Sequence, residues 1–463
     1  MTAPYDVAVV GGGVVGCAVA RRFTLAGAKT ILLEKAPDIL AGASKANSAL
    51  LHTGFDAPAG SLELSCMQEG YAEYLAIRER LNLPLLESGA MVVAWTAEED
   101  AALDQIVALA HSNGVPDVQR ISRSEALTRE PHLSDRMQAA VAVPREHVID
   151  PWSAPLAYLL QALENGAEAR FDSEVTGGSF DGTHWRLETP TGEVTTRAVI
   201  NCAGLFGDRL EEKLLGQSEF EIRPRKGQFV VFDKAAARYL SSIILPVPTE
   251  RTKGIVLCPT IFGNLLVGPT AEEQDDRNRA FVVEETLRQL IDRAGEMLPA
   301  LRDMPVTATY AGLRPASDAK EYRVWSDPAR RWITLGGIRS TGLTASLGLA
   351  AHALRLHEAF GDAAPTPVAA PVWPRLPNLA QHLERDWQAP DHGEIVCHCE
   401  MVTRREIEAA LAGPAPARDA GGLKRRTRAG MGRCQGFYCQ GRVAQLTQGR
   451  FAAPLTDGQC NDK

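Results

Sequence analysis

Residues 5–35 read YDVAVVGGGVVGCAVARRFTLAGAKTILLEK, and this stretch sets the fold of the N-terminal part of the chain. An apolar strand runs into a glycine turn, a helix of small residues, a glycine stop and a second apolar strand, which is the pattern of a βαβ unit. Gly11 permits the tight turn, Gly13 lets the backbone approach a pyrophosphate, and Gly16 allows helix and strand to pack closely. Glu34, at the end of the second strand, can accept hydrogen bonds from a ribose diol. The stretch predicts a dinucleotide site without distinguishing NAD from FAD.

Two further strands break into glycine turns far downstream. Residues 195–208 read TTRAVINCAGLFGD, with the turn at Ala203 and Gly204. Residues 330–353 read RRWITLGGIRSTGLTASLGLAAHA, with the turn at Gly337 ahead of a helix of small residues. Three turns of this kind suggest one sheet whose carboxyl edge holds a long ligand. FAD is long enough to reach all three, so the sequence favours FAD.

Four more segments continue the pattern along the chain. They read ASKANSALLHTGFD (43–56), GQFVVFD (227–233), GIVLCPTIFGNLLVGPTA (254–271) and YAGLRPASD (310–318). With them, the chain resembles the FAD-dependent D-amino-acid oxidase and glycerol-3-phosphate dehydrogenase superfamily, especially type II glycerol-3-phosphate oxidases and dehydrogenases and 2-hydroxyglutarate oxidases. Over about residues 5–360, the resemblance implies an α/β fold: a Rossmann-like FAD-binding domain with a mixed-sheet α+β substrate domain.

The resemblance also implies roles for four side chains near the substrate. His52 falls on the family's active-site histidine and is a candidate general base, although taken alone it could be a loop histidine. Arg314 can clamp a carboxylate or phosphate, or pin its loop through a salt bridge. Lys253 aligns with a basic position of the substrate loop but could be an exposed lysine. Ser340 could donate to substrate or cap the following helix.

A larger set of residues is expected to contact FAD. Ser44 and Ser48 fall on flavin-contacting positions of the family. The third glycine segment is implied to bring a helix N-terminus near the flavin, where it stabilises negative charge on the reduced ring. The expected contacts are Gly11, Gly13, Gly16, Glu34, Ser44, Ser48, Val175, Ala203, Gly204, Gly337, Gly342, Leu343 and Thr344.

Two cysteine pairs lie near the end of the chain, beyond an Ala- and Pro-rich stretch at 361–377 that predicts a linker. Cys397 and Cys399 form a CxC pair, and a CxxxxC pair follows at Cys434 and Cys439. In a regular strand or helix these side chains diverge, so four converging thiolates require both pairs to lie in turns. The interval between the pairs predicts a small fold built around a metal.

The four cysteines could hold zinc or an iron–sulfur cluster. Gly432 and Gly436 give the second pair the freedom to turn. Zinc sites usually have about two to four residues inside each pair, so CxC is a poorer match. The segment resembles the bacterioferritin-associated ferredoxin-like domain, in the version fused to anaerobic glycerol-3-phosphate dehydrogenase, which implies a 2Fe–2S cluster on these cysteines. Five basic residues are expected to surround the cluster and raise its potential: Lys424, Arg425, Arg426, Arg428 and Arg433.

These assignments divide the chain into domains. The FAD-binding domain is expected at 1–85, 145–222 and 325–362, the substrate domain at 86–144 and 223–324, the linker at 363–390 and the 2Fe–2S domain at 391–463.

A flavin that takes up a hydride, joined to a cluster that exports single electrons, predicts a dehydrogenase subunit. Its expected reaction is oxidation of a secondary alcohol next to an anionic group, with glycerol 3-phosphate as the first candidate. Ile338 and Arg339 stand where other glycerol-3-phosphate dehydrogenases have a lysine after Gly-Gly, so a 2-hydroxy acid such as 2-hydroxyglutarate competes. An opine or amino-acid dehydrogenase subunit is the third alternative. An electron-transfer scaffold without its own substrate is the fourth.

The composition of the chain excludes some classes of protein and some kinds of binding partner. A net charge of -8 over 463 residues gives no basic footprint for nucleic acid. No apolar run reaches the ~18 residues of a membrane helix, and the N-terminus lacks a secretory signal, so a cytoplasmic protein is predicted. Nine cysteines, an odd number, fit a reducing compartment. The expected partners are a small anionic substrate and a second flavoprotein or other electron-acceptor subunit, through which the chain could associate with a membrane. The basic residues around the cluster are expected to dock that subunit.

Overall fold

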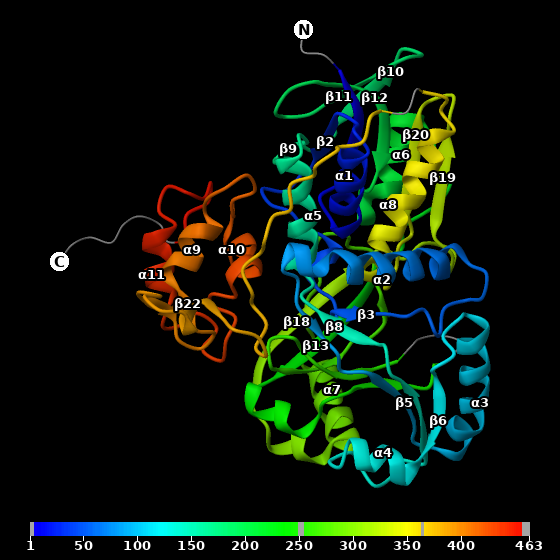
Figure 1. Ribbon diagram of the computed structural model, residues 1–463, viewed down its shortest axis with the longest axis vertical. Coiled ribbons are helices and arrows are strands. Elements are labelled where there is room, and N and C mark those ends of the chain that lie inside the picture. The colour runs from blue at the N-terminus through cyan, green and yellow to red at the C-terminus, as the bar shows by residue number, and fades with distance from the viewer. Residues whose placement is uncertain (1–3, 249–253, 363–364, 456–463) are drawn as a thin grey trace, which may run out of the picture.

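The computed structural model describes residues 4–248, 254–362 and 365–455. Two large domains lie one above the other, and a small C-terminal domain lies against their side (Figure 1). The first domain is built on an eight-stranded sheet and the second on a nine-stranded sheet. The predicted α/β architecture, with a mixed second sheet and a small C-terminal domain, is confirmed.

The first sheet joins the N-terminal βαβ unit to later parts of the chain. Its strands are β1 (Tyr5–Val10), β2 (Thr30–Leu33), β9 (Glu168–Arg170), β10 (Gly177–Phe180), β11 (Trp185–Glu188), β12 (Val194–Asn201), β19 (Arg323–Asp327) and β20 (Trp332–Gly336). β1 pairs in parallel with β2 and β12, and β12 pairs in parallel with β20. Because parallel strands end at the same edge, the glycine turns after β1, β12 and β20 meet there.

Five helices accompany this sheet. They are α1 (Val14–Leu25), α2 (Leu62–Leu81), α5 (Ser153–Glu164), α6 (Gly207–Leu215) and α8 (Gly342–Glu358). α1 packs against both α5 and α8, and α8 packs against α2. A Cβ at Gly348 of α8 would lie 2.2 Å from the carbonyl oxygen of Cys66 in α2, so only glycine allows this approach.

The second sheet supplies the wall opposite the glycine turns. Its strands are β5 (Ala90–Ala94), β6 (Gln119–Ser122), β7 (Ala139–Val143), β13 (Arg225–Phe232), β14 (Ile243–Pro246), β15 (Val256–Pro259), β16 (Leu265–Gly268), β17 (Glu272–Glu273) and β18 (Val306–Arg314). Three helices accompany it: α3 (Ala97–Ser112), α4 (Arg123–Arg129) and α7 (Glu284–Met297). β18 pairs antiparallel with β13, which sets Arg314 opposite Arg225.

A three-stranded sheet lies between the two large sheets in Figure 1. It consists of β3 (Leu50–Leu51), β4 (Leu85–Leu86) and β8 (His147–Ile149). β3 and β8 run antiparallel, with Leu51 opposite His147. The residue after β3, His52, therefore faces the residue before β8, Glu146.

The segment expected to be a linker runs along the body of the protein. From residue 365, where the described part resumes, it has no helix or strand before a short 3₁₀ turn at Asp386–Gln388. Its backbone N–H groups donate from Val368 to the carbonyl oxygen of Leu25 and from Leu376 to that of Leu81, at 3.0 and 3.1 Å. Leu379 and Ala380 are buried in the core of the second domain. The segment is therefore fixed to both large domains.

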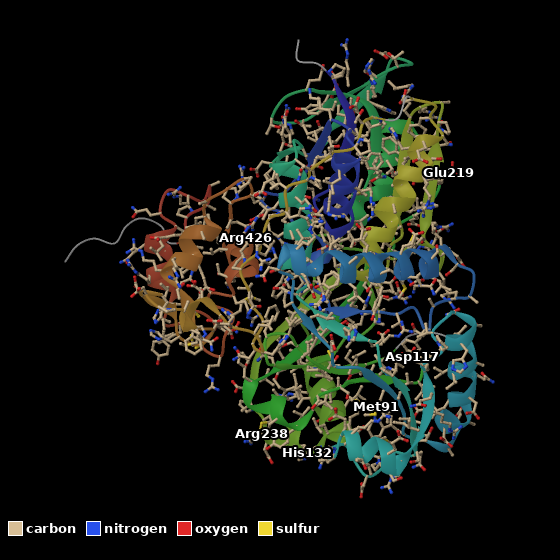
Figure 2. All side chains as sticks on the ribbon, in the orientation of Figure 1. Met91, Asp117, His132, Glu219, Arg238 and Arg426 are labelled. Atoms are coloured by element: carbon tan, nitrogen blue, oxygen red, sulfur yellow. The ribbon has the colours of Figure 1, made fainter. Side chains whose placement is uncertain are left out.

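The C-terminal domain is a small fold with its own core. It contains β21 (Ile395–Cys397), β22 (Val402–Thr403), α9 (Arg404–Ala410), α10 (Ala420–Thr427) and α11 (Gln440–Leu446). Arg426 of α10 forms a bidentate ion pair with Asp38, which follows β2, at 2.7 and 2.8 Å, and both side chains are buried. Arg426 lies on the side of this domain that faces the body (Figure 2).

Four of the five basic residues expected around the cluster also contact the rest of the chain. Arg425 donates to the carbonyl oxygen of Ile39 at 2.9 Å, and Arg433 pairs with Asp233 at 2.8 Å. Arg428 lies over the ring of Phe262, 3.9 Å from its centroid. With Arg426, these residues hold the domain to the rest of the chain, because each finds an acceptor or a ring there. Among the helices that the structure describes, none is long and apolar enough to cross a membrane.

Replacing Asp38 with alanine is expected to loosen the C-terminal domain and to lower the free energy of unfolding by about 3 kcal/mol, because Arg426 is left buried without its partner. The measurement is the urea midpoint together with the rate of proteolysis around residues 365–395. Asp172→Asn is the control, since it removes the exposed Asp172–Arg418 ion pair at the same interface and asparagine tolerates the positive φ at this position; its loss should cost at most ~0.5 kcal/mol. Equal effects of the two substitutions would contradict the role of Asp38.

Candidate active site and cluster site

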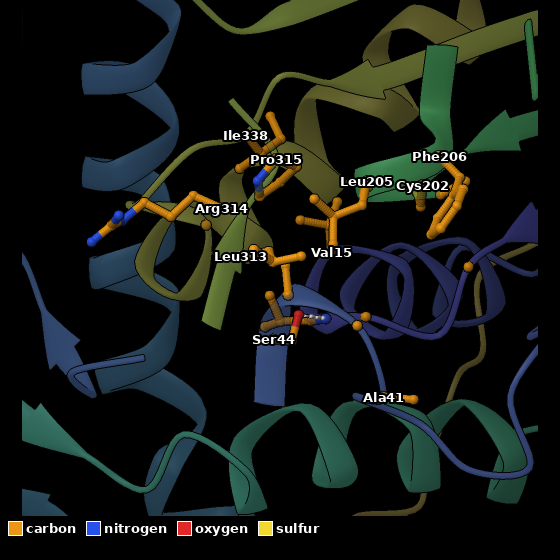
Figure 3. Close-up of a pocket in the computed structure, with 18 of the residues that line it drawn as sticks. Val15, Ala41, Ser44, Cys202, Leu205, Phe206, Leu313, Arg314, Pro315 and Ile338 are labelled. Carbon is orange, nitrogen blue, oxygen red and sulfur yellow. Dashed lines mark hydrogen bonds between the residues drawn. The ribbon is translucent and has the colours of Figure 1, made fainter. Parts of the chain in front are cut away.

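A cavity of about 650 Å³ opens at the carboxyl edge of the first sheet. Its wall brings together many of the expected contact residues: Gly11, Gly13, Glu34, Ser44, Ser48, Val175, Ala203, Gly204, Arg314, Ser340, Gly342 and Leu343. Phe206 and Arg314 lie at opposite sides of the lining residues in Figure 3. The cavity therefore extends from the nucleotide turn to the second domain, as a long ligand requires.

The glycine turn is shaped by close backbone contacts on one side and open space on the other. Gly11 has a φ of +114°, and a Cβ there would lie 2.4 Å from the carbonyl oxygen of Cys202. A Cβ on Gly16 would lie 1.9 Å from the carbonyl oxygen of Gly11, so Gly16 serves helix–strand packing and does not line the cavity. A Cβ on Gly13 would meet only the Ser44 hydroxyl, at 3.2 Å. The space beside Gly13 and the N-terminus of α1 fits a diphosphate.

Two polar side chains border this space. The Ser44 hydroxyl accepts a hydrogen bond from the backbone N–H of Val14 at 3.1 Å (Figure 3). The Glu34 carboxylate accepts from the N–H groups of Gly12 and Ala36 at 2.5 and 2.8 Å. Burial raises the pKa of Glu34, and these backbone donors oppose the rise. Glu34 is thus fixed at the cavity wall, where a ribose hydroxyl can reach it.

Arg314 is a cation that pairs with no carboxylate among the residues that the structure describes. In the described part of the chain its guanidinium donates only to carbonyl oxygens, those of Thr270 at 3.1 Å and Lys226 at 3.5 Å. Burial, together with the charges of Arg225 and Arg339, lowers the pKa of Arg314 to about 10. A pKa of about 10 leaves the guanidinium charged at neutral pH. Arg339 also lines the cavity and acts on Arg314, so two cations lie at this end, which suits an anion.

A neighbouring glycine makes room for Arg314. Gly227, in β13, also lines the cavity, and a Cβ there would lie 2.7 Å from a terminal guanidinium nitrogen of Arg314. This contact explains why the GQFVVFD segment begins with glycine: a larger residue at this position would collide with Arg314.

His52 lies beside the cavity and is held by two neighbours. Its Nδ1 is 2.7 Å from a carboxylate oxygen of Glu146, and its backbone N–H donates to the Thr344 hydroxyl at 3.0 Å. Thr344 belongs to the first turn of α8, whose Gly342 and Leu343 line the cavity. Glu146 was missed by sequence reasoning. Its only signal is its place before β8, which becomes informative once the pairing with β3 is known.

Several expected site residues lie elsewhere. Gly337, Thr344 and His52 do not line the cavity. Ser340 is exposed, and the residue at the N-cap of α8 is Thr341, so the capping alternative for Ser340 is wrong. Lys253 lies outside the described residues.

The four cysteines form two pairs in the C-terminal domain, in or next to turns. Cys397 ends β21, Cys399 lies in the next turn, and Cys439 immediately precedes α11. The thiol of Cys399 interacts with that of Cys434, and the thiol of Cys397 with that of Cys439. Cys399 and Cys434 are partly exposed, whereas the other two are buried.

The surrounding backbone favours the thiolate form of Cys434, whereas burial raises the pKa of Cys399. Hydrogen bonds from the backbone of Tyr438, and also of Gly436 and Phe437, lower the pKa of Cys434. Gly436 has a φ of +93°, and a Cβ on Gly432 would lie 2.3 Å from that of Cys399, so both glycines are needed for the turn, as predicted.

The donor set fits a 2Fe–2S cluster. Each iron of such a cluster needs two protein thiolates, and the four cysteines form two interacting pairs.

Comparison with known proteins agrees with both sites. The family described as FAD dependent oxidoreductase (DAO) matches residues 6–356, and the BFD-like [2Fe-2S] binding domain matches residues 395–448. The glycerol 3-phosphate dehydrogenase of Caloramator mitchellensis is 29% identical, covering 98% of this chain and 96% of that protein. One subunit of the anaerobic glycerol-3-phosphate dehydrogenase of Escherichia coli is 25% identical, covering 96% of this chain and 88% of that protein.

A relative of known structure covers the first two domains. The glycerol 3-phosphate oxidase of Mycoplasma pneumoniae is 31% identical over 76% of this chain and 94% of its own. The structure of the dithionite-reduced L-α-glycerophosphate oxidase from M. pneumoniae with FAD bound superimposes with a TM-score of 0.73, at 27% identity, covering 80% of this chain and 98% of that one. The chain therefore belongs to the DAO family of FAD-dependent oxidoreductases and carries a BFD-like 2Fe–2S domain at its C-terminal end.

Proposed function

We propose that this protein is a cytoplasmic FAD-dependent dehydrogenase that oxidises glycerol 3-phosphate and passes the electrons through its 2Fe–2S cluster to a partner protein. The observation that carries the substrate assignment is Arg314, a cation at the cavity wall that no carboxylate of the described chain neutralises. A buried charge of this kind is costly unless a ligand compensates it. Relatives named for glycerol 3-phosphate support the same substrate.

The residues divide the work of the reaction. Arg314 and Arg339 bind the phosphate and so place the secondary alcohol. His52 takes the hydroxyl proton, while the hydrogen on the same carbon leaves as hydride with both electrons, and the alcohol becomes a ketone. FAD, when bound along the glycine turn and Glu34, is the acceptor of that hydride.

A phosphate fits this end of the cavity better than a single carboxylate. The sequence lacks the lysine that follows Gly-Gly in other glycerol-3-phosphate dehydrogenases. This difference is the argument for a 2-hydroxy acid as the substrate. Arg339 nevertheless lines the cavity and acts on the pKa of Arg314. Two cations at one end suit a phosphate dianion.

Anaerobic flavin bleaching tests this assignment. The purified protein is mixed without oxygen with glycerol 3-phosphate, L-2-hydroxyglutarate, an opine and an amino acid, and flavin absorbance is followed. Glycerol 3-phosphate should bleach the flavin fastest at equal concentration. Faster bleaching by 2-hydroxyglutarate or an amino acid would overturn the substrate, and no bleaching by any of them would leave an electron-transfer scaffold.

The partner follows from the chemistry of the cluster. A 2Fe–2S cluster carries one electron at a time, so its electrons must leave to an acceptor. A second flavoprotein or another electron-accepting subunit is the proposed acceptor, and the likeness to a relative that is itself named as one subunit of a dehydrogenase supports it. Arg426 and Arg428 are buried and are therefore not available to this partner, whereas Arg433, beside Cys434, stays exposed.

Replacing Cys434 with serine is expected to remove the broad iron–sulfur absorption and the acid-labile sulfide while the flavin spectrum stays. Cys434 is proposed as a cluster ligand. It belongs to the C-terminal domain and does not line the flavin cavity. Glycerol 3-phosphate should still bleach the flavin, but transfer to the partner should be lost. Cys258→Ser is the control, because Cys258 is buried in the second domain. About one zinc per chain and no sulfide in the unmodified protein would contradict the cluster.

A further inference from the structure

We propose that Glu146 is a positioning residue for catalysis: it fixes the His52 ring in the tautomer whose Nε2 can accept the substrate proton. The inference rests on the proposed function, because it assigns the state of the base in that reaction. It adds a residue that no motif of the sequence indicated.

The pairing of two strands brings Glu146 and His52 together. Leu51 of β3 stands opposite His147 of β8, so the next residue on one strand faces the preceding residue on the other. One carboxylate oxygen of Glu146 lies 2.7 Å from Nδ1 of His52. Glu146 is fully buried, with a side-chain exposure of 0%, whereas the His52 side chain is 19% exposed. The carboxylate therefore holds the inner edge of a ring that stays accessible.

The two oxygens of Glu146 have separate tasks. Oε1 accepts from the backbone N–H and the hydroxyl of Thr53, at 2.6 and 2.8 Å. Oε2 faces His52. A buried carboxylate needs donors to replace lost water, and Thr53 alone supplies two. Oε2 is therefore left to accept a hydrogen bond from the ring of His52.

The chemistry of the contact sets the tautomer. An ionised carboxylate accepts only, so Nδ1 must carry the proton and donate it to Glu146. The neutral ring then has its lone pair on Nε2, which is the state a general base needs. When Nε2 takes the substrate proton, the imidazolium that forms is paired with Glu146. Among the described residues, no lysine or arginine pairs with Glu146, which leaves its charge to His52.

The substitution Glu146→Gln distinguishes a role of Glu146 in positioning His52 from a role in packing alone. Glutamine can keep the two hydrogen bonds from Thr53 on its carbonyl oxygen, but it presents an amide donor to Nδ1. The ring must then carry its proton on Nε2, where it cannot accept another. We expect flavin reduction at saturating glycerol 3-phosphate to slow by ~100-fold or more, as for loss of a positioned base. The half-saturating concentration should change by less than ~3-fold, because the phosphate end is untouched.

Three companion variants complete the kinetic test on the FAD-loaded full-length protein. Thr53→Ser is the matched control, since it keeps both donors to Glu146 and removes only a buried methyl group; it should stay within ~3-fold of the unmodified rate. Glu146→Asp should recover part of the rate lost in Glu146→Gln. Adding Glu146→Gln to His52→Gln should cost nothing more, because both act through one group.

NMR of the protein with ¹⁵N-labelled histidine gives a readout that does not depend on turnover. His52→Gln identifies the signal of His52 among the ten histidines. The unmodified protein should show Nδ1 protonated, and Glu146→Gln should show the opposite tautomer. An unchanged tautomer, an unchanged reduction rate, or a further slowing of His52→Gln would overturn the proposal. If glycerol 3-phosphate fails but another anion of the panel bleaches the flavin, the proposed substrate is wrong and Glu146 is judged with that anion; if no anion bleaches it, both proposals fail.

Discussion

Replacing Arg314 with methionine is expected to weaken binding of glycerol 3-phosphate by ~10³-fold, about 4 kcal/mol, the scale for truncating one member of a buried charge pair. The phosphate would lose a guanidinium that donates only to carbonyl oxygens in the described chain. The measurement is the concentration dependence of anaerobic flavin bleaching. Arg223→Met, which changes an exposed arginine paired with Glu221, should leave that dependence unchanged.

The same substitution is expected to stabilise the substrate-free protein. Burial lowers the pKa of Arg314 to about 10 from an ordinary value of 12.5. The native state therefore binds fewer protons than the unfolded state between these values, and stability rises as pH increases through that window. Below it, at neutral pH, the charged guanidinium opposes folding. Arg314→Met should raise the melting temperature and abolish the further rise that glycerol 3-phosphate gives. A lower melting temperature with unchanged affinity would make Arg314 a structural residue.

Replacing His52 with glutamine is expected to slow flavin reduction by ~10² to 10⁴-fold, the range for losing a general base. FAD should remain bound, because His52 does not line the cavity that fits the cofactor. Rapid mixing with glycerol 3-phosphate under anaerobic conditions measures the rate. His184→Gln is the control, since His184 lies in the exposed turn between β10 and β11. A rate within ~3-fold of the unmodified protein would return His52 to the role of a loop histidine.

The parts of the fold that the sequence predicts are those with local signals. Gly11, Gly13, Gly16 and Glu34 lie within one βαβ unit, where spacing alone places them around one turn. The cysteine pairs are equally local, and their turns need the glycines beside them. Such patterns can be recognised in a sequence because the backbone conformation of a turn restricts which residues can occupy it.

The parts that the sequence does not predict depend on pairing between distant segments. Glu146 lies 94 residues beyond His52, and only the register of β3 and β8 joins them. Arg426 lies 388 residues beyond Asp38, so a basic run that predicts a cluster environment also forms an interface between domains. A charged residue in sequence gives no sign of the partner that will neutralise it.

The central claim is that one chain takes an electron pair at the flavin and sends single electrons into its cluster. Anaerobic addition of glycerol 3-phosphate to the purified protein, with optical spectra and EPR recorded on the same samples, tests it most directly. The flavin should bleach first, and the EPR signal of a reduced 2Fe–2S cluster should follow without any partner present. A bleached flavin beside a cluster that stays oxidised, or no bleaching at all, would contradict the claim.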